Sequence, residues 1–148
     1  MPVIVVGADS EVGIAIIWRL QMRAGEVRAF VSDREAADAL RGRGLKVAVG
    51  DVSDFSHVEG AARGAFCAVL ITAAPTDGRE TAFANPRSVV EGWLHAVTAA
   101  GVTRVVVVGE APPHGGAPAR EIAAVPTVGR TTDEIAAEVA ALDDAARL

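Results

Sequence analysis

Hydrophobic residues along the chain fall into two alternating patterns, namely short continuous runs and longer stretches with helical spacing. The runs are rich in Val, which is typical of strands buried on both faces of a parallel sheet. They predict five strands, at Val3–Val6, Val27–Val31, Lys46–Val49, Ala68–Ile71 and Arg104–Val108. The stretches between them predict helices, so the pattern indicates repeated β-α-β units and an α/β fold.

Capping residues and glycines mark where these helices begin and end. Helix starts are predicted at Ser32-x-x-Glu35, at Ser56-x-x-Glu59 and at Asn85-Pro86. Helix ends are predicted at Gly25, Gly44, Gly64 and Gly101, because glycine readily adopts the left-handed conformation after a last helical turn. The elements alternate regularly enough to predict one domain spanning residues 1–148.

The pattern changes after the fifth predicted strand. Residues 109–130 are rich in proline and glycine, which predicts a long loop that is either a functional lid or disordered. Thr131-x-x-Glu134 then opens an amphipathic helix predicted over residues 131–147. With no strand expected beyond the fifth, that strand would be an open sheet edge, and we expect a homodimer that covers it or uses the helices at 88–100 and 132–146.

Composition and charge narrow the range of partners. The chain has 148 residues and a formal net charge of −5, so it lacks the basic surface that drives non-specific nucleic-acid binding. No apolar run approaches the roughly 20 residues of a membrane span. Cys67 is the single cysteine, so no intramolecular disulfide forms. These features predict a cytoplasmic protein that binds neither nucleic acid nor a membrane.

A glycine-bounded segment supplies the strongest chemical signal. Gly7-Ala8-Asp9-Ser10-Glu11-Val12-Gly13 follows the first predicted strand and opens the first predicted helix. A dinucleotide-binding turn needs a first glycine for tight geometry and a last glycine for close helix–strand packing, with the pyrophosphate on the helix N-terminus. Three later segments accompany it, namely Gly50-Asp51-Val52-Ser53-Asp54, Thr72-Ala73-Ala74-Pro75 and Ala99–Val108.

Together these segments resemble the atypical and extended short-chain dehydrogenase/reductase superfamily, in particular its NmrA-like and epimerase-like members. The resemblance covers residues 2–108 and implies a three-layer Rossmann fold, a doubly wound parallel sheet in the order 3-2-1-4-5. It implies NAD or NADP in the crevice at the carboxyl ends of the strands. By the same match, Asp51 and Val52 would lie beside the adenine, and Ala73 and Ala74 beside the nicotinamide ribose.

The expected cofactor-binding residues lie in the loops after the first four strands. They are Gly7, Ala8, Asp9, Ser10, Glu11, Val12, Gly13, Ser32, Asp33, Arg34, Asp51, Val52, Thr72, Ala73 and Ala74. Ser10 stands where the family has a middle glycine, and its neighbours Asp9 and Glu11 are acidic. Carboxylates beside a pyrophosphate predict weak binding unless they point away from it.

The choice between NAD and NADP stays open at this stage. Asp33 would favour NAD by accepting a hydrogen bond from a ribose 2′-hydroxyl, whereas Arg34 would favour NADP by meeting a 2′-phosphate. In a purely structural alternative, Ser32 caps the following helix and Asp33 belongs to its first turn.

The resemblance also brings a catalytic expectation that this sequence does not meet. Reductases of the superfamily commonly use a Tyr-x-x-x-Lys pair as proton donor, but the chain has no Tyr, and its only Lys, Lys46, starts the third predicted strand. We therefore predict either an atypical NAD(P)-dependent oxidoreductase without that pair, or a non-catalytic dinucleotide sensor or scaffold acting through protein contacts. The length suggests a cofactor-binding half without a substrate half.

Few other residues are candidates for chemistry. His114 with Glu110, in the proline- and glycine-rich segment, is a candidate acid/base pair above the cofactor. His57 and His95 are predicted to be packing or surface residues, and the cysteine and histidine spacings give no metal-site pattern. Cys67 is predicted to be buried and unreactive, and Trp18 and Trp93 to pack in the core or at an interface.

Overall fold

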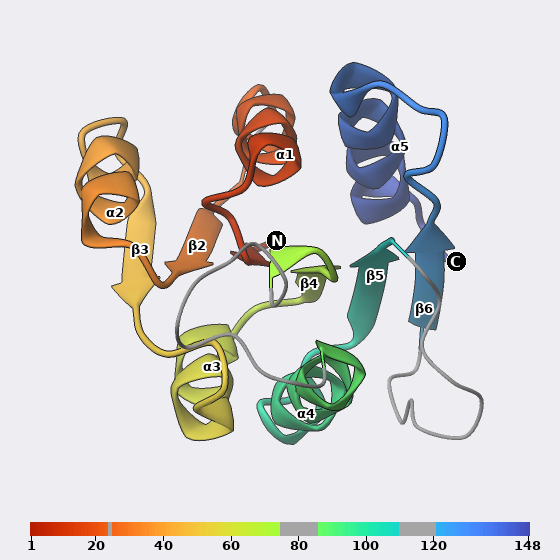
Figure 1. Cartoon of the computed structure of the whole chain (residues 1–148). Helices are drawn as coiled ribbons and strands as arrows, with labels where there is room; N and C mark the ends of the chain where they lie inside the picture. The colour runs from red at the N-terminus through yellow and green to blue at the C-terminus, as the bar shows by residue number, and fades with distance from the viewer. Residues whose placement is uncertain (24, 75–85, 110–120) are drawn as a thin grey trace.

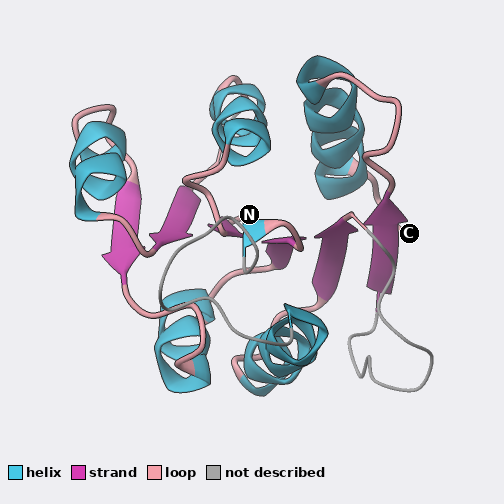
Figure 2. Ribbon diagram, viewed as in Figure 1, coloured by secondary structure: helices cyan, strands magenta, loops and turns pink. Residues whose placement is uncertain are grey.

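A computed structural model describes residues 1–23, 25–74, 86–109 and 121–148. Its strands form one parallel sheet in the order β3-β2-β1-β4-β5-β6 (Figure 2). The strands are β1 Val3–Val6, β2 Val27–Val31, β3 Lys46–Val49, β4 Cys67–Ile71, β5 Arg104–Val108 and β6 Glu121–Val125. The helices are α1 Glu11–Gln21, α2 Arg34–Arg41, α3 Phe55–Ala62, α4 Pro86–Ala99 and α5 Thr132–Asp144.

The helices cover both faces of the sheet. Figure 1 shows α1, α2 and α5 on one side and α3 and α4 on the other. Two hydrophobic clusters result, one on each face, and alternate residues of a strand enter different clusters, as Val5 and Val6 do. This two-sided burial explains why the strands are continuously hydrophobic, and it confirms the three-layer Rossmann fold. All five predicted strands are present, with β4 beginning one residue early, at Cys67.

A sixth strand corrects the prediction of an unbroken loop over residues 109–130. β6 pairs in parallel with β5, from Arg104 opposite Glu121 to Val108 opposite Val125. The prediction that the fifth strand is an open edge was therefore wrong. The run Glu121-Ile-Ala-Ala-Val carries two alanines of low β-propensity and is followed by Pro126, so its local pattern did not indicate a strand.

Two of the predicted helix caps were also wrong by one or two positions. Asp33, rather than Ser32, caps α2, because its carboxylate accepts hydrogen bonds from the amides of Glu35 and Ala36. Asp54, rather than Ser56, caps α3. In both cases a neighbouring aspartate offers two acceptor oxygens where the serine offers one hydroxyl. Asn85 lies outside the described residues, and Pro86 is the first residue of α4.

The predicted C-terminal helix is confirmed as α5, and Thr131 caps it by accepting a hydrogen bond from the amide of Glu134. Arg104, at the start of β5, fastens this helix to the sheet. Its side chain is fully buried and donates hydrogen bonds to the carbonyls of the last turn of α5 and beyond, at Leu142, Asp143 and Ala145. Cationic donors at a helix C-terminus satisfy its unpaired carbonyls and its partial negative charge.

Across the described part of the chain, no helix combines the length and apolar character that crossing a bilayer requires.

Candidate dinucleotide-binding site

The loops that carry the predicted site residues emerge at one edge of the sheet. Val6, the last residue of β1, is the register partner of Phe30 in β2 and Leu70 in β4. Val31 in turn pairs with Val49 at the end of β3. Because all the strands are parallel, the loops after β1, β2, β3 and β4 begin side by side at the carboxyl edge. Ligands of open α/β sheets bind at this edge, beside the point where the strand order reverses.

The two glycines of the first loop are held where no larger residue fits. Gly7 has φ +83°, and a Cβ there would lie 2.5 Å from the Cβ of Ala74. A Cβ on Gly13 would lie 2.8 Å from the Cα and the carbonyl oxygen of Ala8. The amides of Gly7 and Ala8 both donate to the carbonyl of Phe30, at 3.0 and 3.3 Å. The turn is therefore packed tightly against β2, β4 and the start of α1.

Ser10 closes this turn and caps α1. Its hydroxyl donates to the carbonyl of Gly7 and accepts from the amide of Gly13, both at 3.1 Å. The amides of Glu11 and Val12, in the first helical turn, have no acceptor among the described residues. Two such amides at a helix N-terminus, where the helix dipole is positive, favour an anion. Ser10, which stands in place of the middle glycine, thus occupies the amide of Gly13 and leaves the amides of Glu11 and Val12 for an anion.

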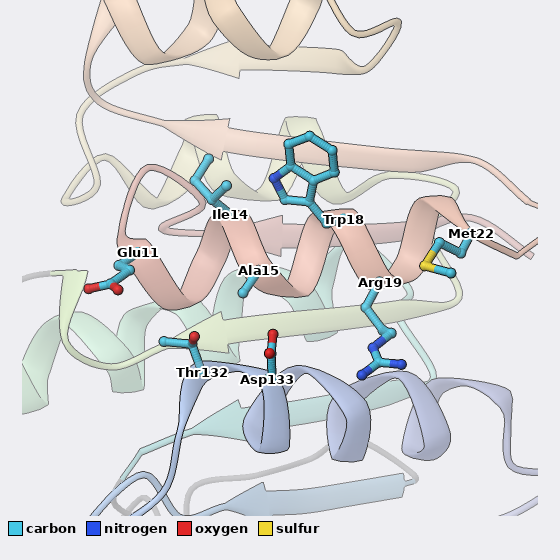
Figure 3. Close-up of a pocket in the computed structure, with 8 residues that line it drawn as sticks. All are labelled: Glu11, Ile14, Ala15, Trp18, Arg19, Met22, Thr132 and Asp133. Carbon is cyan, nitrogen blue, oxygen red and sulfur yellow. The ribbon is translucent and has the colours of Figure 1, made fainter.

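The acidic neighbours of Ser10 do not crowd those amides. The Oδ2 of Asp9 accepts hydrogen bonds from the amides of Ser32 and Asp33, at 3.4 and 3.3 Å, in the loop after β2. Glu11 is exposed, and Figure 3 shows its side chain extending beyond the end of α1. Arg34, the first residue of α2, is also exposed.

The loop after β3 is held by its own side chains and by a tryptophan from α4. The Oδ1 of Asp51 accepts from the amide and the hydroxyl of Ser53, at 2.9 and 2.6 Å. Val52 is fully buried. Its carbonyl accepts a hydrogen bond from the indole of buried Trp93 at 2.7 Å. Sequence reasoning assigned Trp93 to packing and missed this positioning contact, which joins residues 41 positions apart.

The ends of β4 and β5 are tied together by Thr72. Its amide and its hydroxyl both donate to the carbonyl of Val108, each at 3.0 Å. Gly109 has φ +128°, and any Cβ there would collide with the Thr72 hydroxyl. Ala73 is exposed and Ala74 buried beneath Gly7. Among the described residues directly after β4 and β5, at 72–74 and 109, no side chain is ionisable; Glu110 and His114 lie outside the described residues.

The residues present suit a dinucleotide. The glycine turn provides a cradle that a Cβ would fill, and the first-turn amides provide donors for a pyrophosphate. The sequence matches the model of the NAD(P)H-binding family over residues 7–141. The chain belongs to that family. This family binds NAD(P)H, so the cofactor class is NAD(P), as expected from the glycine turn. No curated protein sequence matches the chain.

Solved structures place this NAD(P)H-binding domain among Rossmann proteins. Triphenylmethane reductase from Citrobacter sp., complexed with NADP(H), is 23% identical with a TM-score of 0.63, and the match covers 75% of this chain and 38% of that one. The NADPH-dependent quinone oxidoreductase from Escherichia coli, complexed with NADPH, is 22% identical with a TM-score of 0.59, covering 72% of this chain and 36% of that one. The chain thus spans well under half the length of these two proteins.

A third structure matches almost end to end. The protein ChuY from Escherichia coli O157:H7, described as an anaerobillin reductase, is 17% identical with a TM-score of 0.72, and the match covers 99% of this chain and 92% of that one. At this identity the likeness concerns the fold alone. It extends through β6 and α5, the elements that follow the segment resembling short-chain reductases.

The single cysteine of this NAD(P)H-binding domain lies away from the glycine turn. Cys67 starts β4 at the amino edge of the sheet, the edge opposite the site, and is fully buried. Burial, followed by the nearby Asp143 carboxylate, raises the pKa of the Cys67 thiol far above its usual value. His57 and His95 are exposed. Among the described residues, no three His, Cys, Asp or Glu side chains gather as metal ligands.

A groove of about 460 Å³ runs between α1 and the start of α5 (Figure 3). Its lining residues are Glu11, Ile14, Ala15, Trp18, Arg19, Met22, Thr132 and Asp133. The exposed indole of Trp18 carries the guanidinium of Arg43 stacked 3.1 Å from its ring centroid. Trp18 is therefore a surface residue rather than a core one. Glu11 is the single lining residue that also belongs to the glycine turn.

Proposed function

We propose that the protein binds an NAD(P) dinucleotide across the loops after β1 to β4 and uses it in hydride transfer. The observation that carries this proposal is the glycine turn, where Gly7 and Gly13 are closely packed and two first-turn amides have no acceptor among the residues that the structure describes. In this proposal the loops after β2, β3 and β4 line the ribose, the adenine and the nicotinamide sides in turn, and the strand order of the fold supports this arrangement.

The acceptor we propose is a conjugated molecule, such as a quinone or a triphenylmethane dye. When bound across these loops, NAD(P)H would supply a hydride to the conjugated system of such an acceptor, and any proton that the acceptor needs would come from water. Thr72 does not supply that proton in this arrangement, because its hydroxyl donates to the Val108 carbonyl. What the chain contributes is orientation: Thr72, Ala73 and Gly109 form an uncharged floor at the ends of β4 and β5. The reductases of dyes and quinones among the structural neighbours support this substrate class.

A pair of substitutions at Glu11 tests the dinucleotide site directly. Proline is favoured at the first helical position, and Ser10 before it is already extended, with φ −85° and ψ 162°. Glu11→Pro therefore removes one anion-binding amide while sparing the helix, and Glu11→Ala, the matched control, removes the same carboxylate but keeps the amide.

Titration of both variants with NADH and NADPH, followed by nicotinamide fluorescence, measures the effect. We expect Glu11→Ala to bind at least as tightly as the wild type and Glu11→Pro to bind roughly tenfold more weakly, the loss typical of one charge-assisted hydrogen bond. Saturation by neither nucleotide, or equal affinities for the two variants, would contradict the proposed site.

The alternative function, a dinucleotide sensor or scaffold, rests on the uncharged floor and the absence of Tyr from the sequence. Incubation of the protein with NADH or NADPH and a quinone or dye separates the two functions. Steady cofactor oxidation that requires the protein supports the oxidoreductase, whereas tight binding without turnover supports the sensor.

The homodimer and the cytoplasmic location both stay predictions. The argument for the dimer changes, because the sheet edge that it would cover is a different strand. The edge strand on the α5 side of the described sheet is β6, where Ile122 is 40% exposed, rather than β5. Light scattering over a range of concentrations decides the oligomeric state, and a monomeric mass throughout would refute the dimer.

A further inference from the structure

An internal anion already occupies the loop where the fold places the adenosine ribose. The Oδ2 of Asp9 accepts from two consecutive amides, those of Ser32 and Asp33, at 3.4 and 3.3 Å. Consecutive backbone amides at the entrance to a helix form a concave anion site with positive potential. Asp9 reaches it from the loop after β1, 23 and 24 positions earlier in the sequence.

We propose that Asp9 makes the protein selective for NAD(H) over NADP(H). In this fold the ribose 2′ position lies at the end of β2, where a hydroxyl meets a carboxylate in NAD sites and a phosphate meets a cation in NADP sites. The carboxylate of Asp9 holds the two amides that would otherwise donate to a 2′-phosphate. Its negative charge repels that phosphate, whereas an uncharged 2′-hydroxyl meets no such repulsion. This inference rests on the proposed dinucleotide site.

Asp33, the residue that the sequence suggests as the partner of the ribose, caps α2 instead. Both carboxylate oxygens of Asp33 accept from amides of α2, one from Glu35 and the other from Ala36, each at 3.3 Å. Asp33 therefore serves as a helix cap, and the carboxylate on the ribose-side amides comes from the first loop. Asp9 is thus the specificity residue even though its position in the sequence is that of a phosphate-loop residue.

Arg34 is the residue that would oppose this selectivity. It is exposed at the start of α2, and its cation would attract a 2′-phosphate. An exposed cation is screened by solvent, however, whereas Asp9 is half-buried and bonded to the amides themselves. The balance therefore favours NAD(H), in contrast to the two structural neighbours complexed with NADP(H) and NADPH.

Affinities for NADH and NADPH, measured by calorimetry, test the proposal without any need for turnover. Two charges of a phosphate near one carboxylate predict that the wild type binds NADH roughly tenfold or more tightly than NADPH. Asp9→Asn keeps the shape and one acceptor oxygen but removes the charge, so NADPH affinity should rise roughly tenfold with little change for NADH. Asp38→Asn, an exposed aspartate of α2, is the matched control and should leave the ratio unchanged.

The outcomes separate this proposal from the proposed function. If the wild type binds both nucleotides with equal affinity, or prefers NADPH, the role of Asp9 is overturned while the dinucleotide site stands. If the wild type prefers NADPH and Arg34→Ala loses that preference, specificity belongs to Arg34. Binding of neither nucleotide overturns the site itself. The wild-type ratio decides the matter even if Asp9→Asn fails to fold, and a folded Asp9→Asn without the NADPH gain refutes the proposal.

Discussion

The Nε of Arg104 donates a hydrogen bond to the Oε2 of Glu121 at 2.7 Å, and the same two residues are register partners at the start of β5 and β6. The guanidinium is fully buried, while the carboxylate keeps some contact with solvent. Arg104 thus joins β6 to β5 through Glu121. Through three carbonyls it also joins the end of α5 to these two strands. The amino edge of the domain depends on this cation.

Replacing Arg104 by Met should therefore cost far more stability than a surface change. Removing one partner of a buried, hydrogen-bonded ion pair typically costs about 3–5 kcal/mol. Arg41→Met, which breaks an exposed pair with Asp38 at 3.6 Å, should cost less than about 1 kcal/mol. Urea denaturation of both variants measures the difference, and similar midpoints would show that the carbonyl contacts of Arg104 contribute little.

The same pair should make stability depend on pH. The hydrogen bond from Arg104 holds the pKa of the Glu121 carboxyl below its usual 4.5 in the folded protein. A carboxyl with a lowered folded pKa stabilises the fold above its unfolded pKa, and this contribution disappears as pH falls through the folded pKa.

We therefore expect Glu121→Gln to be less stable than the wild type at pH 7, with the gap closing as the pH falls below 4.5. Thermal unfolding of both proteins across this range measures the gap. A gap that stays constant with pH would mean that the ionised carboxylate is not what stabilises this edge.

Cys67 should resist alkylation in the folded protein. Burial and the Asp143 carboxylate raise the pKa of its thiol, so the reactive thiolate is rare at pH 8, and the sulfur has no solvent contact. Labelling with iodoacetamide should remain negligible until denaturant unfolds the chain, and mass spectrometry gives the labelled fraction. Rapid labelling without denaturant would indicate local opening of β4.

Ser10 should limit dinucleotide affinity. Ser10→Gly restores the middle glycine of the family and frees the Gly13 amide, which the serine hydroxyl now occupies. We expect tighter NADH binding with a loss of stability of only a few tenths of a kcal/mol, because glycine is an acceptable helix cap. Ser10→Ala also frees the amide but should cost about 1 kcal/mol. Weaker binding by both variants would mean that the hydroxyl itself contacts the ligand.

Local patterns were sufficient for most of the fold but not for the connections between distant segments. The Val-rich runs and the glycine turn located five strands and the first loop, because burial on both faces leaves a mark in the sequence itself. β6 was not predicted because Ala123 and Ala124 have low β-propensity, and only its pairing with β5 makes it a strand. In the site, the bond of Asp9 to the loop after β2 and that of Trp93 to Val52 join residues far apart, and no local pattern encodes either.

The carbonyls that receive Arg104 lie 38 to 41 positions further along the chain. During synthesis, Glu121 therefore follows Arg104 first, and the carbonyl acceptors of the guanidinium are missing until the end of α5 has followed. Before then, burying the start of this strand would leave guanidinium donors of Arg104 without their acceptors, so we expect the last helix to be needed for stable docking of the β5 edge. Such dependence on distant contacts is typical of slow folding, and it makes the closing stretch of the chain the step that completes the sheet.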